Sequence, residues 1–446
     1  MLSRIKSSGA QLLSVQAWKI RLVFFGGALL VGLVAAVFAI LCDFANDWFR
    51  EQSHQSTYLP FIITPLGLVI LVWLTRRVFP GSQGSGIPQS IATIEMTHHE
   101  DRSQLLSIRI AIGKMLLTIG GLFSGASIGR EGPTVHVGAS IMYSLGHMAR
   151  FPNHFMERGL VMAGGAAGIA AAFNTPLAGI MFAIEEMSRS FEQRTSGTLI
   201  TAVALAGITA IALQGNYTYF GTASVEVELI GSILLAILAC GVIGGLLGGL
   251  FSFILVWGSR CIAPMQNRWP ILIAAACGLI IAIVGLLSDG QTFGTGYEEA
   301  KQVLSGEGDV VAGFTFYKII ATLASYLSGI PGGIFAPSLS AGAGLGAIVA
   351  PWFSGTPETA IVILCMAGFF SAVVQTPLTS IIIIMEMTNN QTLLLPIMMT
   401  SFIAYGISRI INHEEIYRAL ARPFIEQAAA RHKPADSRLQ ENEHLV

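Results

Sequence analysis

The sequence predicts an all-α polytopic membrane protein made of two related halves, with many broken and re-entrant helices. Three observations predict this class: recurring apolar runs, a low content of charge, and an internal repeat. Of the 446 residues, 53% are hydrophobic and 11% are charged, whereas a soluble domain carries about a quarter charged residues. A transmembrane β-barrel would instead need short segments of alternating polarity.

Apolar runs recur along the whole chain, as expected for helices that cross a membrane. Examples are residues 21–44, 61–74 and 232–257. The first run is too long for the apolar region of a typical signal peptide, and no small-residue cleavage site clearly follows it. The residues up to 21 include four basic residues and no acid, so the positive-inside tendency places the N-terminus in the cytoplasm.

Small residues are unusually frequent. The chain has 49 glycines, more than the average usage of about 7%, many of them in runs such as "AGGAAGIAAAF" and "SAGAGLGAIVA". Such runs allow close helix packing in lipid. They also supply sharp breaks, which a membrane tolerates only where backbone lines a cavity or packs on protein.

Charge and cysteine content exclude several classes of protein. The net charge of −1 gives no reason to expect a nucleic-acid partner. The five cysteines are scattered without a CxxC pair, so we expect apolar packing rather than disulfides or a metal site. The "HHED" run at 98–101 is interpreted as a solvated loop rather than a set of metal ligands.

A shift of 204 residues brings two regions into register. It aligns Lys114 with Lys318, Gly129 with Gly333, and Pro133 with Pro337; a shift of 201 then aligns "TPLAGIMFAIE" (175–185) with "TPLTSIIIIME" (376–386). We therefore expect repeat halves at about 21–215 and 228–425, with substrate bound where they meet. Residues present in both copies, including both lysines and the pair Glu185 and Glu386, are expected to be architectural.

Two carboxylates break this internal symmetry. Glu131 aligns with Phe335, and Glu186 aligns with Met387. An acid in an apolar membrane segment costs about 2.5–3.5 kcal/mol on insertion scales. An acid that only one copy retains therefore favours a functional interpretation.

Several segments share one form, in which turn residues and a proline precede an apolar helix. They are "GSGIP" (84–88), "GREGP" (129–133), "NTP" (174–176), "GGIFAP" (332–337) and "QTP" (375–377). Proline suits the first helical turn, and the free N–H groups there, with the helix dipole, favour an anion. Several such starts could hold an anion without a buried cation that binds it too tightly for transport. Ordinary helix starts after loops are the alternative.

These motifs resemble a known family. "GSGIP", "GREGPTVHVG" and "GGIFAPSL" are similar, in order, to the three signature motifs of the CLC chloride channel and transporter family. The resemblance extends from about residue 25 to 425. It implies a CLC-type fold of two inverted repeats with tilted, broken and re-entrant helices, and a homodimer with one pathway per subunit.

The resemblance also implies roles for single residues. It places the Ser85 hydroxyl and the backbone N–H groups of Ile334 and Phe335 at a central anion site, and Tyr417 at its inner side. Ser85 favours chloride, because nitrate-preferring relatives carry proline there. One departure is Gln89, where many relatives carry an acid.

Glu131 matches the family's external gating glutamate, and Glu186 matches the internal proton-transfer glutamate of the exchangers. A carboxylate that fits an anion site competes with chloride until protonation releases it. Burial favours its neutral form, whereas helix starts favour its charged form. We expect Arg130, next to the gate, to be an orienting or structural charge.

The sequence therefore predicts a chloride/proton antiporter, not an enzyme, in a prokaryotic inner membrane. Chloride and protons are its transported ligands, and we expect no cofactor, metal or nucleic acid. A passive chloride channel on the same fold is the nearest alternative; an intramembrane hydrolase using Ser127 and His136 lacks an evident acid partner. A transporter of another solute would need polar groups that we do not find. We expect a cytoplasmic segment at 1–20, the membrane domain at 21–425, and a polar tail at 426–446.

Overall fold

The structure, a computed structural model, describes residues 15–149, 154–188, 193–215, 217–222, 225, 227 and 231–432. Helices make up the regular structure of these residues, which contain no strand and only two isolated β-bridges. The predicted all-α class is therefore confirmed.

Two series of helices follow one another along the chain. The first comprises α2 (Val15–Gln55), α3 (Pro60–Arg77), α4 (Ile87–Glu95), α5 (His99–Leu105), α6 (Ile108–Phe123), α7 (Glu131–Met148), α8 (His154–Phe173), α9 (Pro176–Phe182), the π-helix η1 (Ala183–Ser188) and α10 (Gln193–Gln214). The second comprises α11 (Ser232–Arg268), α12 (Pro270–Leu287), α13 (Tyr297–Ser305), α14 (Phe314–Leu327), α15 (Phe335–Val349), the short 3₁₀-helix η2 (Ala350–Trp352), α16 (Glu358–Val374), α17 (Pro377–Thr388) and α18 (Leu394–Ile411), and α19 (Ile416–His432) then ends the described chain.

The second series repeats the first in both length and packing. Helices α3 and α12 each have 18 residues, and α4 and α13 each have nine. Helix α7 packs on α8 as α15 packs on α16, and α2 packs on α10 as α11 packs on α18. Across the two series, α3 contacts α12 and α9 contacts α17.

The equivalence extends further than the sequence alignment did. Gly84 and Gly86, before α4, have positive φ angles of 63° and 96°, and Gly294 and Gly296, before α13, have 68° and 78°. These "GSG" and "GTG" turns are related by a shift of 210 residues, so Gln89 is equivalent to Glu299. This shift differs from the shift of 204 found further along the chain, so the two repeats align here only if a gap of several residues is allowed. A comparison without gaps therefore misses the equivalence.

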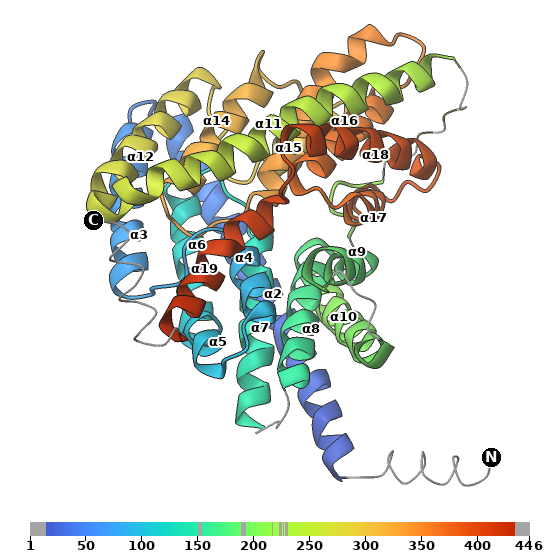
Figure 1. Cartoon of the computed structure of the whole chain (residues 1–446). Coiled ribbons are helices and arrows are strands. Elements are labelled where there is room, and N and C mark those ends of the chain that lie inside the picture. Colours follow the sequence, from blue (N-terminus) through green and yellow to red (C-terminus); the bar gives the residue numbers. More distant parts are fainter. Residues whose placement is uncertain are drawn as a thin grey trace, which may run out of the picture.

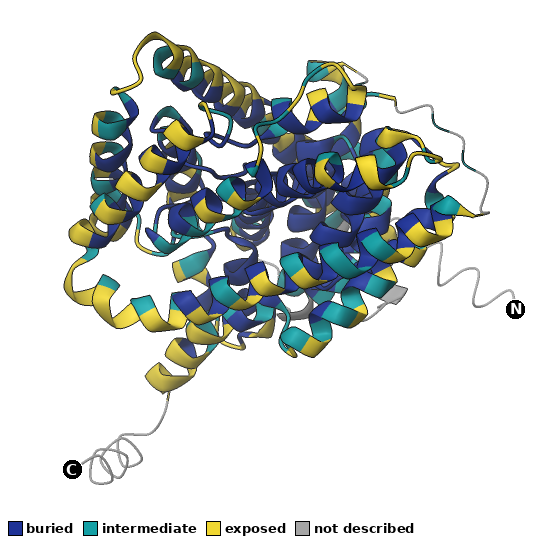
Figure 2. Cartoon of the chain, turned by 90° about the horizontal axis from the view of Figure 1, so that it is seen from above, coloured by how far each residue is buried: buried dark blue, intermediate teal, exposed yellow. Residues whose placement is uncertain are grey.

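The helices have the character of a multi-pass membrane protein. Six of them within the described residues are long and apolar enough to cross a membrane, from length and composition: Trp18–Gln55, Pro60–Arg77, His99–Phe123, Ser232–Arg268, Pro270–Leu287 and Leu394–Ile411. Large apolar side chains such as Leu235, Ile62 and Leu272 lie exposed on outward faces, while buried residues gather in the interior (Figure 2). The nine residues of α4 span about 14 Å, less than the hydrocarbon thickness of about 30 Å, so α4 is too short to cross a membrane by itself.

Figure 1 shows how the chain ends by crossing back. First-half helices, blue to green, lie mainly in the lower part of the view, and second-half helices, yellow to red, lie mainly above them. Helix α19 returns to the first half and packs beside α4. It continues to His432, past the start of the tail predicted at 426, and α2 begins at Val15, within the segment predicted at 1–20. Residues 1–14 and 433–446 lie outside the described residues.

Two smaller expectations need correction. The "HHED" run is not a simple loop, because α5 begins at His99; the Asp101 carboxylate lies 2.8 Å from His432 Nε2 at the end of α19. This long-range contact is invisible to local sequence patterns. Four cysteines are buried as expected, but Cys261 is exposed on α11.

Candidate functional site

Three helix starts are joined to one another by backbone hydrogen bonds. The N–H groups of Gly129 and Gly333 each donate to the other's carbonyl oxygen, both at 2.8 Å. Gly84 N–H donates to the Ile330 carbonyl at 3.1 Å, and Gly332 N–H donates to the Gly84 carbonyl at 3.0 Å. The loops before α4, α7 and α15 are therefore joined in one junction between the two halves.

The close approach depends on glycine at the two paired positions. A Cβ atom added to Gly129 would lie 3.3 Å from Ala336 N and 2.2 Å from a carboxylate oxygen of Glu131. A Cβ atom added to Gly333 would lie 3.1 Å from Gly132 N. Each loop thus exposes its backbone to the first N–H groups of the other half's helix.

Repeat-related lysines fix the turns before α4 and α13. Lys114 Nζ donates to the carbonyls of Gln83 and Gly84 at 3.2 and 2.9 Å. Lys318 Nζ donates to the carbonyls of Thr292 and Gly294 at 3.0 and 2.9 Å. The architectural role expected for both lysines is confirmed.

Ser85 directs an unpaired hydroxyl at this junction. The residue is 1% exposed, and its Oγ has no hydrogen-bond partner among the described residues. A Cβ atom on Gly132 would lie 2.2 Å from this Oγ, so the hydroxyl sits against the start of α7. Gly86, not Ser85, is the N-cap of α4, and the helix has no side-chain cap. The hydroxyl therefore remains available to donate to an anion.

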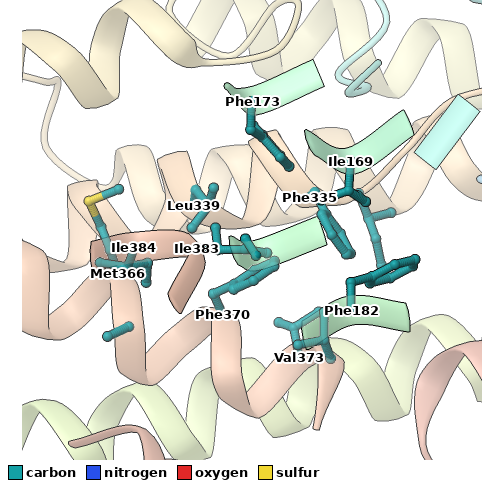
Figure 3. Packing of buried hydrophobic residues seen from close by; sticks show 14 of the residues in the cluster. Ile169, Phe173, Phe182, Phe335, Leu339, Met366, Phe370, Val373, Ile383 and Ile384 are labelled. Atoms are coloured by element: carbon teal, nitrogen blue, oxygen red, sulfur yellow. The ribbon is translucent and has the colours of Figure 1, made fainter. Parts of the chain in front are cut away.

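Ile334 and Phe335 supply backbone donors from the second half. Ile334 is the N-cap of α15 and Phe335 its first residue, where backbone N–H groups lack intrahelical acceptors. The Phe335 ring points away into an apolar cluster, 5.0 Å from the Phe370 ring and 6.3 Å from the Phe182 ring (Figure 3). The ring therefore packs in the core, while the backbone N–H belongs to the unpaired first turn of α15.

Glu131 lies fully buried at the start of α7. Neither carboxylate oxygen makes a hydrogen bond of normal geometry within the described residues. The backbone N–H of Ala336, in the first turn of α15, faces the carboxylate, and Arg130 and Asp43 are nearby charges. The carboxyl group therefore lies among helix starts that favour a small anion.

Tyr417 packs near the Phe335 ring. It is completely buried near the start of α19, and its hydroxyl has no hydrogen-bond partner among the described residues. Its ring centroid lies 5.8 Å from that of Phe335. Tyr417 and Ser85 thus contribute two buried, unpartnered hydroxyls, and such groups are costly unless a partner satisfies them.

Glu186 lies on the π-helix η1. It is 1% exposed, and a π-bulge of this kind often marks a functional site. Tyr417 is within electrostatic range of both Glu186 and Glu131. Both asymmetric carboxyl groups therefore lie near Tyr417.

Glu185 and Glu386 have a different role, which the repeat predicted only in outline. Glu386 accepts from the N–H groups of Leu177 and Ala178 at 3.2 and 2.8 Å, at the start of α9. Glu185 accepts from Leu378 and Thr379 at 3.1 and 2.6 Å, at the start of α17. Each acid thus caps a helix of the other half, which confirms its architectural role.

The Arg130 side chain is held on α2, a contact compatible with either an orienting or a structural charge. Its Nη1 donates to the Ala39 carbonyl at 2.9 Å and to Asp43 at 2.5 Å. Sequence reasoning missed Asp43, although it stands as an acid at the end of the first apolar run. The structure does not support a hydrolytic pair of Ser127 and His136. Ser127 Oγ lies 3.0 Å from the Thr322 hydroxyl, and His136 Nε2 lies 2.9 Å from the Leu105 carbonyl oxygen, so each side chain has another partner.

The fold and the junction define a class of protein: a polytopic membrane protein in which two repeated halves join their helix starts by backbone hydrogen bonds, with buried hydroxyls and a buried carboxyl group nearby. The family model described as "Voltage gated chloride channel" matches residues 66–409. The chain belongs to this family.

Named relatives and solved structures agree with this assignment. The chain is 30% identical over 422 residues to the H(+)/Cl(-) exchange transporter ClcA of Vibrio cholerae, covering 88% of this chain and 86% of the relative. It is 30% identical over 435 residues to the protein of that name from Yersinia pestis, covering 91% and 88%.

Among solved structures, a slow cyanobacterial Cl−/H+ antiporter matches with a TM-score of 0.78 at 23% identity, over 92% of this chain and 98% of that one. A CLC-type fluoride/proton antiporter matches with a TM-score of 0.75 at 25% identity, over 90% and 97%. The first of these likenesses supports the fold alone.

Proposed function

We propose that the protein exchanges chloride for protons across a prokaryotic inner membrane. The observation that carries the proposal is the position of Glu131, whose buried carboxylate lies at helix starts suited to an anion. Relatives that are 30% identical over most of the chain are named as exchangers of these two ions.

In this proposal, chloride occupies the junction of the three helix starts. The hydroxyls of Ser85 and Tyr417 and the N–H groups of Ile334 and Phe335 donate to it. None of these donors carries a full charge, so the ion is bound without being trapped. The buried hydroxyls, which have no partner in the described chain, support the assignment.

Glu131 acts in the proposal as both gate and proton carrier. When charged, its carboxylate competes with chloride for the same donors; when protonated, it loses this advantage and leaves. Each departure of Glu131 therefore admits an anion and moves a proton. Because one group performs both tasks, the two fluxes are linked.

Glu186 supplies protons from the other side. It is buried near Tyr417, so a proton passing from Glu186 to Glu131 travels around the tyrosine rather than along the chloride path. The acid at this position favours exchange over a passive chloride channel, the second candidate function. The proposal includes a homodimer with one pathway per subunit, as the family resemblance implies.

Two cavities give the proposed pathway its ends. The Arg418 cavity, of about 450 Å³, lies between α4, α18 and α19, and the Arg130 cavity, of about 410 Å³, lies beside α2, α10 and α13. Asp43 in the Arg130 cavity stands 28 residues after Val15 on α2, or about 42 Å along the helix. With a cytoplasmic N-terminus, we assign this cavity to the outside.

A test uses purified protein in liposomes loaded with high chloride and diluted into low chloride, with potassium and valinomycin clamping the membrane potential. Exchange predicts that outward chloride movement drives protons inward against their gradient, so the medium becomes alkaline. Protein-free liposomes are the control. Chloride release without uphill proton movement would assign the protein to the channel alternative.

A further inference from the structure

The two cavities differ in the balance of charge on their walls. The Arg418 cavity is lined by three arginines and three glutamates: Arg409, Arg418, Arg422, Glu95, Glu414 and Glu415. The Arg130 cavity is lined by three acids, Asp43, Asp47 and Glu298, and by Arg130 as its single Lys or Arg. We call each cavity a mouth of the proposed pathway. The mouth at Arg418 has equal numbers of arginines and acids, whereas the mouth at Arg130 is acidic, although an anion is proposed to pass through it.

The single arginine of the acidic mouth is not free to attract anions. Its side chain is 8% exposed, and Nη1 lies 2.5 Å from an Asp43 oxygen, while the Asp43 side chain is 59% exposed. The same Nη1 also donates to the Ala39 carbonyl one turn earlier on α2. Asp43 therefore holds the guanidinium against α2 and offsets its charge from the solvent side.

The Asp43–Arg130 ion pair, called the Arg130 clamp below, is one residue away from the proposed gate, Glu131. Arg130 is the N-cap of α7, and its carbonyl accepts from the Thr134 N–H at 2.9 Å and from the Thr134 hydroxyl at 2.8 Å. Glu131 is the next residue. A change in the Arg130 pairing alters the field at the gate, although Asp43 does not need to contact the transported ion.

We propose that Asp43 is a positioning residue that fixes Arg130 and keeps the affinity of this mouth for chloride low. With Asp43 charged, the mouth presents mainly carboxylates, which repel chloride and attract protons. Without that charge, Arg130 becomes an unpaired cation beside the entrance and chloride binds more tightly from this face alone. This inference rests on the proposed pathway, but it does not require proton coupling.

The experiment measures the chloride dependence of ³⁶Cl⁻ flux from each face, in right-side-out and inverted membrane vesicles containing the full chain. Asp43→Asn is expected to lower KM on the Arg130-cavity face by about three- to tenfold, with KM on the other face and kcat changed by less than about twofold. Asp43→Glu restores the wild-type KM, because the longer acid keeps the pair.

Asp47→Asn is the matched control. Asp47 lines the same cavity one turn further along α2, exposed and without an ion pair among the described residues. Asp47→Asn removes one negative charge from the cavity but leaves the ion pair of Asp43 with Arg130 intact. We therefore expect it to change KM by less than half as much as Asp43→Asn does. An equal effect would overturn the specific role of Asp43, as would a fall in kcat with KM unchanged.

A second measurement needs no substitution. Replacing an inert salt by sucrose lengthens the Debye length from about 8 Å toward 30 Å. The acidic mouth then repels chloride more strongly, so wild-type KM rises on the Arg130-cavity face and stays nearly constant on the balanced face. Equal shifts on both faces would overturn the proposal even if Asp43→Asn fails to fold. The experiment measures chloride flux alone. If the protein moved chloride without protons, the exchanger assignment would be refuted, but the proposal for Asp43 would not.

Discussion

Helices α7 and α15 begin at equivalent places in the two halves, yet their first side chains point in different directions and differ in polarity. Glu131 keeps a buried carboxylate at the junction, facing the Ala336 N–H, whereas the Phe335 ring leaves the junction and packs among Phe182 and Phe370. The backbones around them remain symmetric, through the paired bonds of Gly129 and Gly333. The comparison teaches that the scaffold is duplicated while the buried acid at the helix start is not.

The largest expected effect comes from removing the asymmetric acid itself. Glu131→Gln keeps the shape but never carries a negative charge, so it neither competes with chloride as a carboxylate nor shuttles a proton. Proton movement in liposomes should fall to the level of protein-free vesicles, while chloride flux continues and no longer depends on pH. Stoichiometric proton pumping by this variant would refute the gating role.

The matched control for Glu131 lies in the other half. Phe335→Leu retains the backbone N–H at the start of α15 and costs about 1 kcal/mol in packing. It should retain proton coupling with a small loss of thermal stability. Loss of coupling here would mean that the two helix starts share the proton role.

The second effect separates the inner acid from the gate. Glu186→Gln should abolish proton coupling as well, but chloride flux should keep its pH dependence because Glu131 still gates from the other side. Proton flux and chloride flux measured across a pH series test this. Unchanged coupling would place the inner proton site elsewhere.

The third effect concerns the acids that both halves share. Glu185→Ala and Glu386→Ala each remove a carboxylate that caps a helix of the opposite half. Each change should destabilise the protein by about 1 kcal/mol, allowing for partial exposure of the acid. Melting in detergent measures the loss, and the ratio of protons to chloride should be unchanged. An altered ratio would give these acids a transport role.

The smallest effect tests the pair Gln89 and Glu299. Glu299 forms an ion pair with Arg50 and lies near Lys318, whereas Gln89 donates to the Gln83 carbonyl at 2.6 Å and gives Lys114 no counter-charge. Gln89→Glu should weaken chloride binding by roughly two- to fivefold, because the added charge on α4 opposes the anion. Titration calorimetry with chloride measures it, with Gln89→Met as the uncharged control. Tighter binding would contradict this account.

Much of the candidate site could be predicted from sequence because its donors are local. A proline or glycine turn before an apolar run indicates a helix start, and the resemblance to the family then pointed to the backbone N–H groups of Ile334 and Phe335. The repeat then separated Glu131 and Glu186 from acids present twice, such as Glu386. Tyr417 was harder to assign, because its segment has no repeat partner and only thin similarity to the family motif.

The contacts that join distant segments could not be predicted. Asp43 and Arg130 are 87 residues apart, and nothing in either local pattern indicates the other. The reciprocal caps made by Glu185 and Glu386 likewise connect segments some two hundred residues apart. The contact between Asp101 on α5 and His432 at the end of α19 joins residues 331 positions apart, so no local pattern indicates it.

The sequence by itself determined the all-helical membrane class, the duplication and the residues that break it, because apolar length, fixed offsets and turn residues are local properties of the chain. Only the tertiary structure decided where the helix starts meet, that Phe335 turns its ring away, and that Asp43 clamps Arg130. The reason is physical: electrostatic and hydrogen-bond energies depend on distances of a few ångström between residues far apart in the chain, and only packing sets those distances.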